Sequence, residues 1–247
     1  MKISGNTVLV TGGTSGIGLG LARGLAQSGN TVVVAGRRRE QLDRVAAEHP
    51  ELDVLQLDVT DPASIAEAAA TLLRTHPNFN VLINNAGVML PENLGDPDWL
   101  SVSEHTIDTN LLGPLRMTHA LLPHLIARDD AAIVNVSSGL AFVPLPATPT
   151  YNATKAAIHS FTESLRIQLA DTGVQVIELV PPAVRTTLMG QQDDERAMPL
   201  EDFLSATLAL LRSEPDAKEI IVDQVKFLRY AEATGSYDRV LALLGAH

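Results

Sequence analysis

A short apolar run that ends at a cluster of glycines constrains the fold of this chain more than any other stretch. Residues 7–11 (TVLVT) are mostly β-branched, which is typical of a buried parallel strand. Gly12, Gly16 and Gly18 follow, and residues 19–27 then have the pattern of a helix. Glycines at such a junction permit a tight turn and direct the first N–H groups of the helix at an incoming diphosphate. The alternative is a plain strand-to-helix turn, and the spacing G-x-x-x-G-x-G differs from the more familiar G-x-G-x-x-G.

The rest of the chain continues this alternation of strands and helices. We predict an α/β fold: a Rossmann-type doubly wound parallel sheet of about seven strands, formed by residues 1–247 as a single domain. Residues 187–213 are expected to form a substrate lid, and residues 223–247 a C-terminal tail. The predicted strands are 7–11, 31–35, 53–57, 80–83, 131–136, 174–180 and 219–222. The predicted helices are 19–27, 40–48, 62–75, 97–128, 151–170, 200–212 and 237–244, and the polar stretch 190–196 is predicted to be mobile.

Composition excludes several classes of function. The 247 residues are 45% hydrophobic, which is enough for a large core. A formal net charge of −11 argues against a nucleic acid or an anionic membrane as partner, because both require a basic surface. Without cysteine there are no disulfides or thiolate ligands, and the histidines form no i, i+4 pair, so no metal site is predicted. We find no signal segment or membrane span in the sequence and expect a cytoplasmic protein.

The end of the second predicted strand indicates which dinucleotide binds. An NAD-binding unit carries an acidic residue here for the ribose 2′-hydroxyl. This chain has Gly36 followed by Arg37, and a guanidinium binds a 2′-phosphate through paired charge-assisted hydrogen bonds. The sequence therefore predicts NADP, with NADPH preferred over NADH. The alternative is a solvated basic turn formed by Arg37, Arg38 and Arg39.

Polar residues at other strand ends extend the predicted site. Asp58 follows the third strand, where its carboxylate can accept the adenine amino group or cap the next helix, although Asp61 is the better cap. Residues 84–87 (NNAG) end the fourth strand; they permit close approach of a flat ligand and pinning of neighbouring strands, or form an ordinary turn. Asn110 lies inside the predicted helix 97–128. Because burial of an unpaired amide is unfavourable, Asn110 is expected to bind a structural water or to face solvent.

Tyr151 and Lys155 are four residues apart, so a helix places them on one face. A phenol has a pKa of about 10, and lowering it to near 7 requires roughly 4 kcal/mol. An ammonium about 5 Å away supplies roughly 3 kcal/mol at an effective dielectric constant of about 20, and a cationic nicotinamide ring would supply the remainder. The pair can therefore act as a general acid–base. Taken alone, the same spacing is also common on exposed helices.

Together these motifs resemble the short-chain dehydrogenase/reductase family, in its single-domain branch, over nearly the whole chain. The resemblance rests on T-G-x-x-x-G-x-G at 11–18, NNAG at 84–87, Asn110, Ser138 and Y-x-x-x-K at 151–155. The stretches 181–184 (PPAV) and 226–230 (KFLRY) resemble, more narrowly, the DltE-like oxidoreductases of that family. One departure is Pro182, where the family usually has glycine. Because proline fixes φ and removes an N–H, we expect a stiffer loop over the nicotinamide.

The resemblance implies roles for individual residues. Tyr151 would protonate a carbonyl oxygen as hydride arrives, or deprotonate an alcohol in reverse, while Ser138 polarises that oxygen. Lys155 would bind the nicotinamide ribose and bias Tyr151, and Asn110 would hold a water that links Lys155 to solvent. The implied catalytic residues are Asn110, Ser138, Tyr151 and Lys155. The implied cofactor-binding residues are Gly12, Thr14, Ser15, Gly16, Ile17, Gly18, Arg37, Asp58, Val59, Asn85, Ala86, Gly87, Tyr151, Lys155, Pro181, Val184 and Thr186.

The residues expected to line the substrate site are nearly all apolar: Met89, Leu140, Phe142, Val143, Leu145, Leu188 and Met189. They predict a hydrophobic ketone or secondary alcohol, and hence an NADP-dependent carbonyl reductase. The alternatives are a non-catalytic NADP-binding regulator and a 3-oxoacyl thioester reductase, although Asp129, Asp130 and Asp171 would repel an acidic carrier. The family resemblance and the apolar faces of helices 97–128 and 151–170 imply a homodimer or homotetramer.

Overall fold

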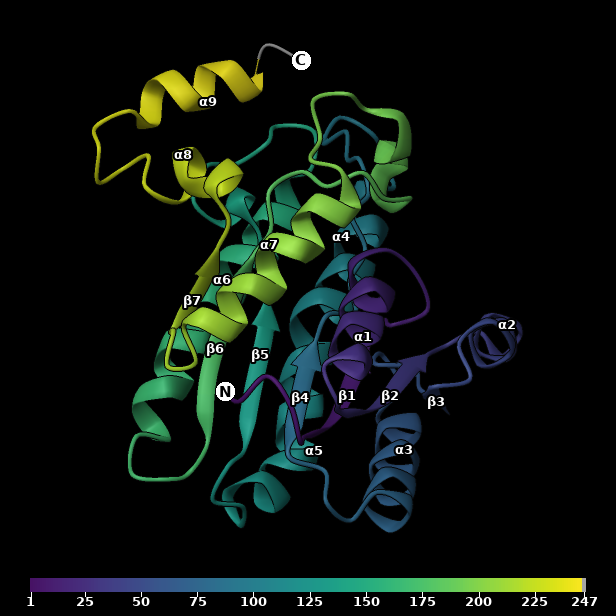
Figure 1. Ribbon diagram of the computed structural model, residues 1–247. Helices are drawn as coiled ribbons and strands as arrows, with labels where there is room; N and C mark the ends of the chain where they lie inside the picture. The colour runs from purple at the N-terminus through teal and green to yellow at the C-terminus, as the bar shows by residue number, and fades with distance from the viewer. Residues whose placement is uncertain (246–247) are drawn as a thin grey trace.

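The computed structural model describes residues 1–245, and within this range the strands form one parallel sheet between two layers of helices (Figure 1). The order across the sheet is β3-β2-β1-β4-β5-β6-β7. From β1 the chain adds β2 and β3 on one side, and from β4 it adds β5 to β7 on the other. The boundary between β1 and β4 is therefore the switch point of a doubly wound sheet. The strands are β1 (Thr7–Thr11), β2 (Thr31–Gly36), β3 (Leu52–Gln56), β4 (Val81–Asn84), β5 (Ala132–Val136), β6 (Gln175–Val180) and β7 (Glu219–Ile221). This confirms the predicted fold class.

The main helices alternate with these strands. They are α1 (Gly16–Gln27), α2 (Arg39–Glu48), α3 (Pro62–Thr75), α4 (Trp99–Ile107), α5 (Gly113–Ile126), α6 (Pro149–Gln168), α7 (Leu200–Ser213), α8 (Lys226–Arg229) and α9 (Tyr237–Gly245). Short turns of tighter helix are η2 (Gly139–Ala141), η3 (Leu188–Asp193) and η4 (Asp223–Val225). Among residues 1–245, no helix combines the length and apolar character that a membrane crossing requires.

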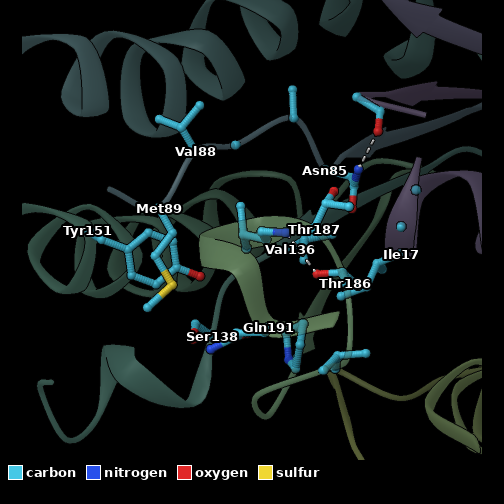
Figure 2. A pocket seen from close by; sticks show the side chains of 18 of the residues that line it. Ile17, Asn85, Val88, Met89, Val136, Ser138, Tyr151, Thr186, Thr187 and Gln191 are labelled. Carbon is cyan, nitrogen blue, oxygen red and sulfur yellow. Dashed lines mark hydrogen bonds between the residues drawn. The ribbon is translucent and has the colours of Figure 1, made fainter. Parts of the chain in front are cut away.

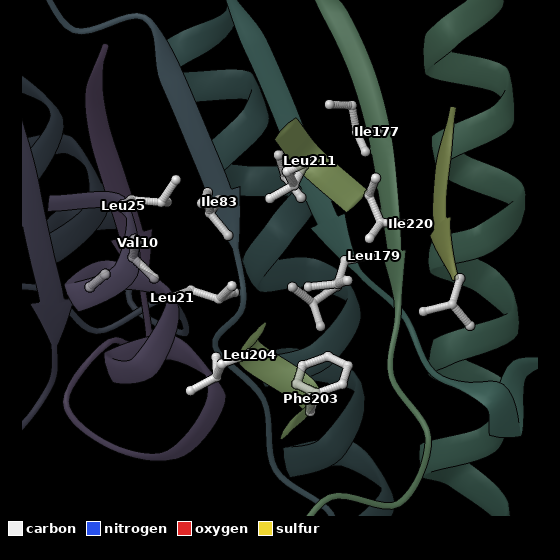
Figure 3. Packing of buried hydrophobic residues seen from close by; sticks show 14 of the residues in the cluster. Val10, Leu21, Leu25, Ile83, Ile177, Leu179, Phe203, Leu204, Leu211 and Ile220 are labelled. Atoms are coloured by element: carbon white, nitrogen blue, oxygen red, sulfur yellow. The ribbon is translucent and has the colours of Figure 1, made fainter. Parts of the chain in front are cut away.

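Two apolar cores hold the layers to the sheet. On one face α1 and α7 pack against the strands, with Leu21, Phe203 and Leu204 between them (Figure 3). On the other face α3, α5 and α6 cover the sheet through residues such as Leu72, Leu121 and Leu165. Both faces of the strands are therefore buried, which explains their continuous apolar sequences.

Helix α3 starts where the sequence predicts. Asp61 accepts a hydrogen bond from the backbone N–H of Ala63 at 2.9 Å, and Pro62 occupies the first helical position. Proline is favoured there because its missing N–H would have no helical partner. Asp61 is therefore the cap, which leaves Asp58 free of that role.

The predicted long helix 97–128 is instead two helices joined by a π-helical segment, η1 (Asp108–Leu112). The interruption has two causes. Pro114 lacks the N–H that a continuous α-helix would direct at the carbonyl of Asn110. The Asn110 side chain also forms two hydrogen bonds with the backbone of Val88, which lies outside the helix. A π-helical turn re-aims such a side chain without ending the helix.

The predicted lid region 187–213 divides into two parts with different positions. Leu188 and Gln191 of η3 lie at the pocket described below. Phe203, Leu204 and Leu211 of α7 are buried in the core against α1 and the sheet. The prediction was therefore wrong for residues 200–213, because the apolar face of that helix is covered by the sheet. The tail 223–247, as far as residue 245, contains η4, α8 and α9, which lie beyond the carboxyl ends of β5 and β7 (Figure 1).

Candidate active site

A pocket with a volume of about 730 Å³ lies beyond the carboxyl ends of the central strands. Its lining includes Gly12 after β1, Asn85 after β4, Ser137 and Ser138 after β5, and Pro181 after β6. This is the crevice where open parallel sheets bind ligands, because the loops after adjacent strands separate there. Every predicted cofactor-binding residue lines it.

The glycine loop forms one wall of the pocket. Gly12 has φ of +63°, and a Cβ atom there would lie 2.7 Å from Cα of Ala86. At Gly18 a Cβ would lie 2.4 Å from Nδ2 of Asn85. Larger residues at these positions would force the loop away from the segment after β4. The loop therefore keeps the N-terminal N–H groups of α1 beside the cavity, which is an arrangement that fits a diphosphate.

The 84–87 segment is held in place by its own hydrogen bonds. The Thr11 hydroxyl accepts from the backbone N–H groups of Asn85 at 3.0 Å and Ala86 at 3.1 Å. The Asn85 amide donates to the carbonyls of Thr11 and Gly12 at 3.0 and 3.1 Å. Asn84 donates to Oδ1 of Asn135 on β5 at 2.9 Å. These bonds pin neighbouring strands together, one of the two possibilities that the sequence left open.

The end of the pocket near β2 and β3 is basic. Arg37 and Arg38 both line it, and Nη1 of Arg37 lies 3.9 Å from Oδ2 of Asp58. Burial tends to raise the pKa of Asp58, but hydrogen bonds from Thr60 and the charge of Arg37 bring that pKa below its ordinary value. Asp58 is therefore a carboxylate at neutral pH. It already accepts from the Thr60 backbone N–H and hydroxyl at 2.9 and 2.7 Å.

Ser138, Tyr151 and Lys155 converge at the pocket from two elements. Ser138 follows β5, and Tyr151 and Lys155 lie one turn apart on α6. Figure 2 shows the Tyr151 phenol pointing into the cavity, with Ser138 on the same side, while Ile17 and Asn85 lie on the opposite side. All three side chains are at least nine-tenths buried. Nζ of Lys155 donates to the Val136 carbonyl at 2.8 Å and lies 5.6 Å from the centroid of the Tyr151 ring.

The protonation states of this pair differ from the expectation that Lys155 lowers the phenol toward pH 7. Burial raises the pKa of Tyr151 to about 12, and the Ser138 hydroxyl offsets this only in part. Burial lowers the pKa of Lys155 to about 8, against the opposing charge of Glu178. Desolvation is therefore the largest influence on both pKa values. At neutral pH Tyr151 holds its proton and Lys155 carries its charge.

Asn110 is buried and does not line the pocket, so of the two alternatives from the sequence the solvent-facing side chain was wrong. Its Oδ1 accepts from the Val88 N–H and its Nδ2 donates to the Val88 carbonyl, both at 2.8 Å. A backbone partner thus satisfies the buried amide. The geometry brings Asn110 behind the pocket wall, with Thr154 of α6 3.4 Å from Nδ2.

The predicted substrate residues separate into two groups. Met89, Leu140, Leu145 and Leu188 line the pocket. Phe142, Val143 and Met189 do not. Phe142 turns away to pack between His159 and Arg229, and Val143 is fully buried in the core. Met189 is partly exposed in a left-handed conformation, at φ of +53°. These three predictions were wrong because the turns in η2 and η3 reverse the direction of successive side chains.

Other lining residues were not anticipated from the sequence. Val88 follows the NNAG motif directly, and its position beside Met89 could have been inferred from that adjacency. Further residues come from η3, η4, α8 and α9, which no motif connects to the site: Gln191, Gln224, Phe227, Leu228 and Leu244. Phe227 and Leu228 belong to the KFLRY stretch, which the sequence marked only as a family likeness.

Comparison with known proteins agrees with this geometry. A family model described as short chain dehydrogenase matches residues 6–197. The uncharacterized oxidoreductase DltE of Bacillus subtilis (strain 168) is 39% identical over 246 residues, covering 97% of this chain and 96% of that relative. The NADP-dependent 3-hydroxy acid dehydrogenase YdfG of Escherichia coli O6:H1 is 36% identical over 181 residues, covering 73% of each chain.

A solved structure extends the likeness to three dimensions. The crystal structure of a short chain dehydrogenase from Burkholderia cenocepacia J2315 in complex with NADP has a TM-score of 0.81 at 28% identity and covers 99% of both chains. The resemblance drawn from the motifs, including its DltE-like character, is confirmed. The chain belongs to the short-chain dehydrogenase family of oxidoreductases.

Proposed function

We propose that this protein is a carbonyl reductase that transfers hydride between NADP(H) and a hydrophobic ketone or secondary alcohol. The observation that carries the proposal is the convergence of Ser138, Tyr151 and Lys155 on one pocket with the glycine loop. The three side chains lie where loops from adjacent parallel strands meet, so a bound dinucleotide would extend from the loop toward them.

The residues at this end supply proton transfer and charge stabilisation. NADPH, when bound, supplies the hydride that reduces the carbonyl carbon. Tyr151 gives its proton to the developing alkoxide oxygen, and its pKa of about 12 means that the acid form is present at neutral pH. Ser138 donates a hydrogen bond to the same oxygen. The phenolate that remains is stabilised by Lys155, whose ammonium at 5.6 Å from the ring supplies roughly 3 kcal/mol at an effective dielectric constant of about 20.

The substrate end of the pocket favours an uncharged molecule. Val88, Met89, Leu140, Leu145 and Leu188 give it an apolar surface. Arg196 also lines the pocket, but both carboxylate oxygens of Asp194 bind its guanidinium, at 3.0 and 3.1 Å. A substrate carboxylate would have to compete with Asp194, so a neutral ketone is preferred over a hydroxy acid.

A substrate screen tests the reaction. The purified protein is mixed with NADPH and a panel of aryl and alkyl ketones, a 3-oxoacyl thioester and a 3-oxo acid, and NADPH oxidation is followed by absorbance. The reverse reaction is followed with NADP+ and the matching alcohols. Turnover of neutral ketones supports the proposal. Turnover confined to the thioester or the acid would show that the substrate belongs to that class and is not a neutral ketone. No turnover with any compound would favour a non-catalytic NADP-binding protein.

Tyr151→Phe then assigns the acid. The variant keeps the ring and loses the proton, so we expect NADPH binding within about twofold of wild type and a fall in kcat of roughly 100-fold to 10,000-fold. Binding is measured by the fluorescence of bound NADPH and turnover by absorbance. A variant that retains more than a tenth of the wild-type rate would contradict the role of Tyr151.

Arg37 carries the proposed preference for NADPH. Arg37→Asp removes a charge-assisted contact worth about 1.5–3 kcal/mol, so the ratio of kcat/KM for NADPH over NADH should fall roughly 10-fold to 100-fold. Arg39→Asp is the matched control, since Arg39 pairs with Asp43 at the start of α2 and does not line the pocket. An unchanged ratio in the first variant, or an equal change in both, would mean that Arg37 does not contact the phosphate.

A further inference from the structure

Helix α6 presents a third titratable side chain on the face that carries the proposed catalytic pair. Tyr151, Lys155 and His159 are spaced four residues apart, so they follow one line along the helix. The pocket ends at Lys155, and His159 lies beyond it. Ring nitrogen Nδ1 of His159 is 2.7 Å from Oε2 of Glu178 on β6. Glu178 therefore lies under the same line of side chains.

Glu178 is an unusual residue for the middle of a parallel strand. Its side chain is completely buried, and Oε1 has no hydrogen-bond partner among the described residues. Its neighbours along β6 are apolar, as a buried strand requires. A buried carboxylate is strongly unfavourable unless opposite charges surround it. Its retention at this position therefore requires nearby cations.

The groups around Glu178 provide those cations from three directions. His159 approaches from α6, where Lys155 lies one turn earlier. Nζ of Lys155 donates to the carbonyl of Val136, which pairs across the sheet with Leu179, the residue after Glu178. Arg229 approaches from α8 and is bound to Glu219, the residue of β7 that pairs with Glu178. A second carboxylate, Glu219 of β7, binds Arg229 at 2.9 and 3.0 Å. One nitrogen of His159 and one oxygen each of Glu178 and Glu219 lie within 4.8 Å of one another. The exposed Glu163 faces the other side of His159 at 3.8 Å.

These charges nearly balance without the imidazole. Two buried or half-buried carboxylates, Glu178 and Glu219, lie near the guanidinium of Arg229 and the amine of Lys155, which is a cation when protonated. Arg229 is held in place by both oxygens of Glu219 and by the Phe142 ring, whose centroid is 4.4 Å away. Arg229 is thus committed largely to Glu219. The charge of Glu178 then acts on His159 and on Lys155.

We propose that Glu178 is a positioning residue that keeps Lys155 in its ammonium form, with His159 and Arg229 holding the carboxylate behind it. The inference rests on the proposed function, because the ammonium matters only if Lys155 supports proton transfer at Tyr151. The direction of the effect agrees with the geometry: burial lowers the pKa of Lys155 to about 8, and Glu178 is the group that opposes this fall. Without Glu178, the pKa of Lys155 would fall further, and the amine would lose more of its charge at neutral pH.

Competitive acetylation measures the charge on Lys155 without reference to activity. The protein is treated with a trace of acetic anhydride between pH 6 and 10.5, and the labelling of each lysine is quantified by mass spectrometry. Lys155 lines the pocket, so the small reagent can reach it. The other lysines, Lys2, Lys218 and Lys226, serve as internal references. The midpoint of labelling reports the pKa of each amine.

We expect Glu178→Gln to lower the Lys155 midpoint by about one pH unit or more, a tenfold loss of proton affinity. Glu178→Asp should restore most of the wild-type midpoint, because it keeps the charge. Glu163→Gln is the matched control and should leave the midpoint unchanged, since it removes a carboxylate of α6 that is exposed. If Glu178→Gln does not fold, judged by its thermal unfolding curve, Glu178→Met supplies the same measurement. An unchanged Lys155 midpoint in the folded variant overturns the proposal.

A pH profile separates this proposal from the proposed function. With a ketone substrate, the alkaline limb of kcat/KM should move to lower pH in Glu178→Gln by the same amount as the labelling midpoint. If the midpoint moves and the wild-type protein reduces no ketone, Glu178 still sets the charge of Lys155 and the reductase assignment fails. If ketones are reduced and neither the midpoint nor the alkaline limb moves, the reductase assignment stands and the role of Glu178 is refuted.

Discussion

Lys155 is a buried cation, and the burial of its charge lowers the free energy of unfolding. The difference between its folded pKa of about 8 and its ordinary value of 10.5 corresponds to roughly 3 kcal/mol. A Lys155→Met variant should therefore be more stable than wild type at pH 7, by up to roughly 3 kcal/mol, and inactive. The comparison uses urea denaturation without nucleotide, with Lys218→Met as a control at an exposed lysine.

The pH dependence of this difference has a definite sign. The folded pKa of Lys155 lies below the unfolded value, so unfolding takes up a proton between pH 8 and 10.5. Across this window wild-type stability rises relative to Lys155→Met, and the advantage of the variant disappears as the amine becomes neutral in both states. A constant difference from pH 7 to 10.5 would show that lost packing, and not the buried charge, determines it.

At the scale of single residues the sequence is most informative where chemistry and spacing coincide. The positions of Ser138, Tyr151 and Lys155 at one pocket follow from a strand end and from helical periodicity, and both can be read from the sequence. The placement of Phe142 cannot be read in this way. It is apolar and close to Ser138 in sequence, but the turn in η2 points its ring at His159 and Arg229. The charged cluster around Glu178 was missed for a related reason: its members come from α6, β6, β7 and α8.

At the scale of elements, Asn110 connects the α4–α5 junction to the pocket wall. Asn110→Ala leaves the N–H and carbonyl of Val88 without their partner, and each buried unpaired group costs about 1–3 kcal/mol. We expect the free energy of unfolding to fall by roughly 2–6 kcal/mol for the two groups. A ketone should also bind more weakly, because Val88 and Met89 line the pocket. Denaturation in urea and the KM for a ketone measure the two effects.

A matched control exists for this variant. Asn93 lies in an exposed loop and bonds only to Asp96 and Gly95 nearby, so Asn93→Ala should change stability by less than about 0.5 kcal/mol. Similar losses in the two variants would mean that Asn110 has no special function in joining the elements. The strands and most helices could be predicted from the sequence because the periodicity of their apolar residues is local. The π-helical turn depends on Val88, which is distant in sequence, so the local periodicity of residues 97–128 does not reveal it.

At the scale of the whole molecule, the order of strands and the position of the crevice follow from the alternation of strands and helices, because parallel βαβ units join in few ways. The covering of the pocket by α8 and α9 does not follow, because these short helices carry no strand pattern and their place depends on packing against η2 and on each other. Surfaces that contact another molecule are also hard to predict from the sequence, because they too depend on packing. A single chain shows only which apolar residues are exposed.

We propose that the chain forms a homodimer through the surface of α4 and η1. Leu100, Ile107 and Leu112 are exposed there by 53%, 39% and 37%, although each is a large apolar residue. Burial of this surface by a second copy would stabilise the dimer by about 25 cal/mol per Å² of apolar area, and a stable interface needs roughly 1,200–2,000 Å² in total.

Light scattering at micromolar concentration should give twice the monomer mass, or four times if α6 contributes a second interface. Leu100→Glu should shift the equilibrium toward monomer, because an unpaired carboxylate would be buried between the copies. Leu94→Glu, at a similarly exposed leucine in the preceding loop, should not shift it. A monomeric wild-type protein would reject the dimer. Equal dissociation of both variants would mean that the contact does not lie on the surface of α4 and η1.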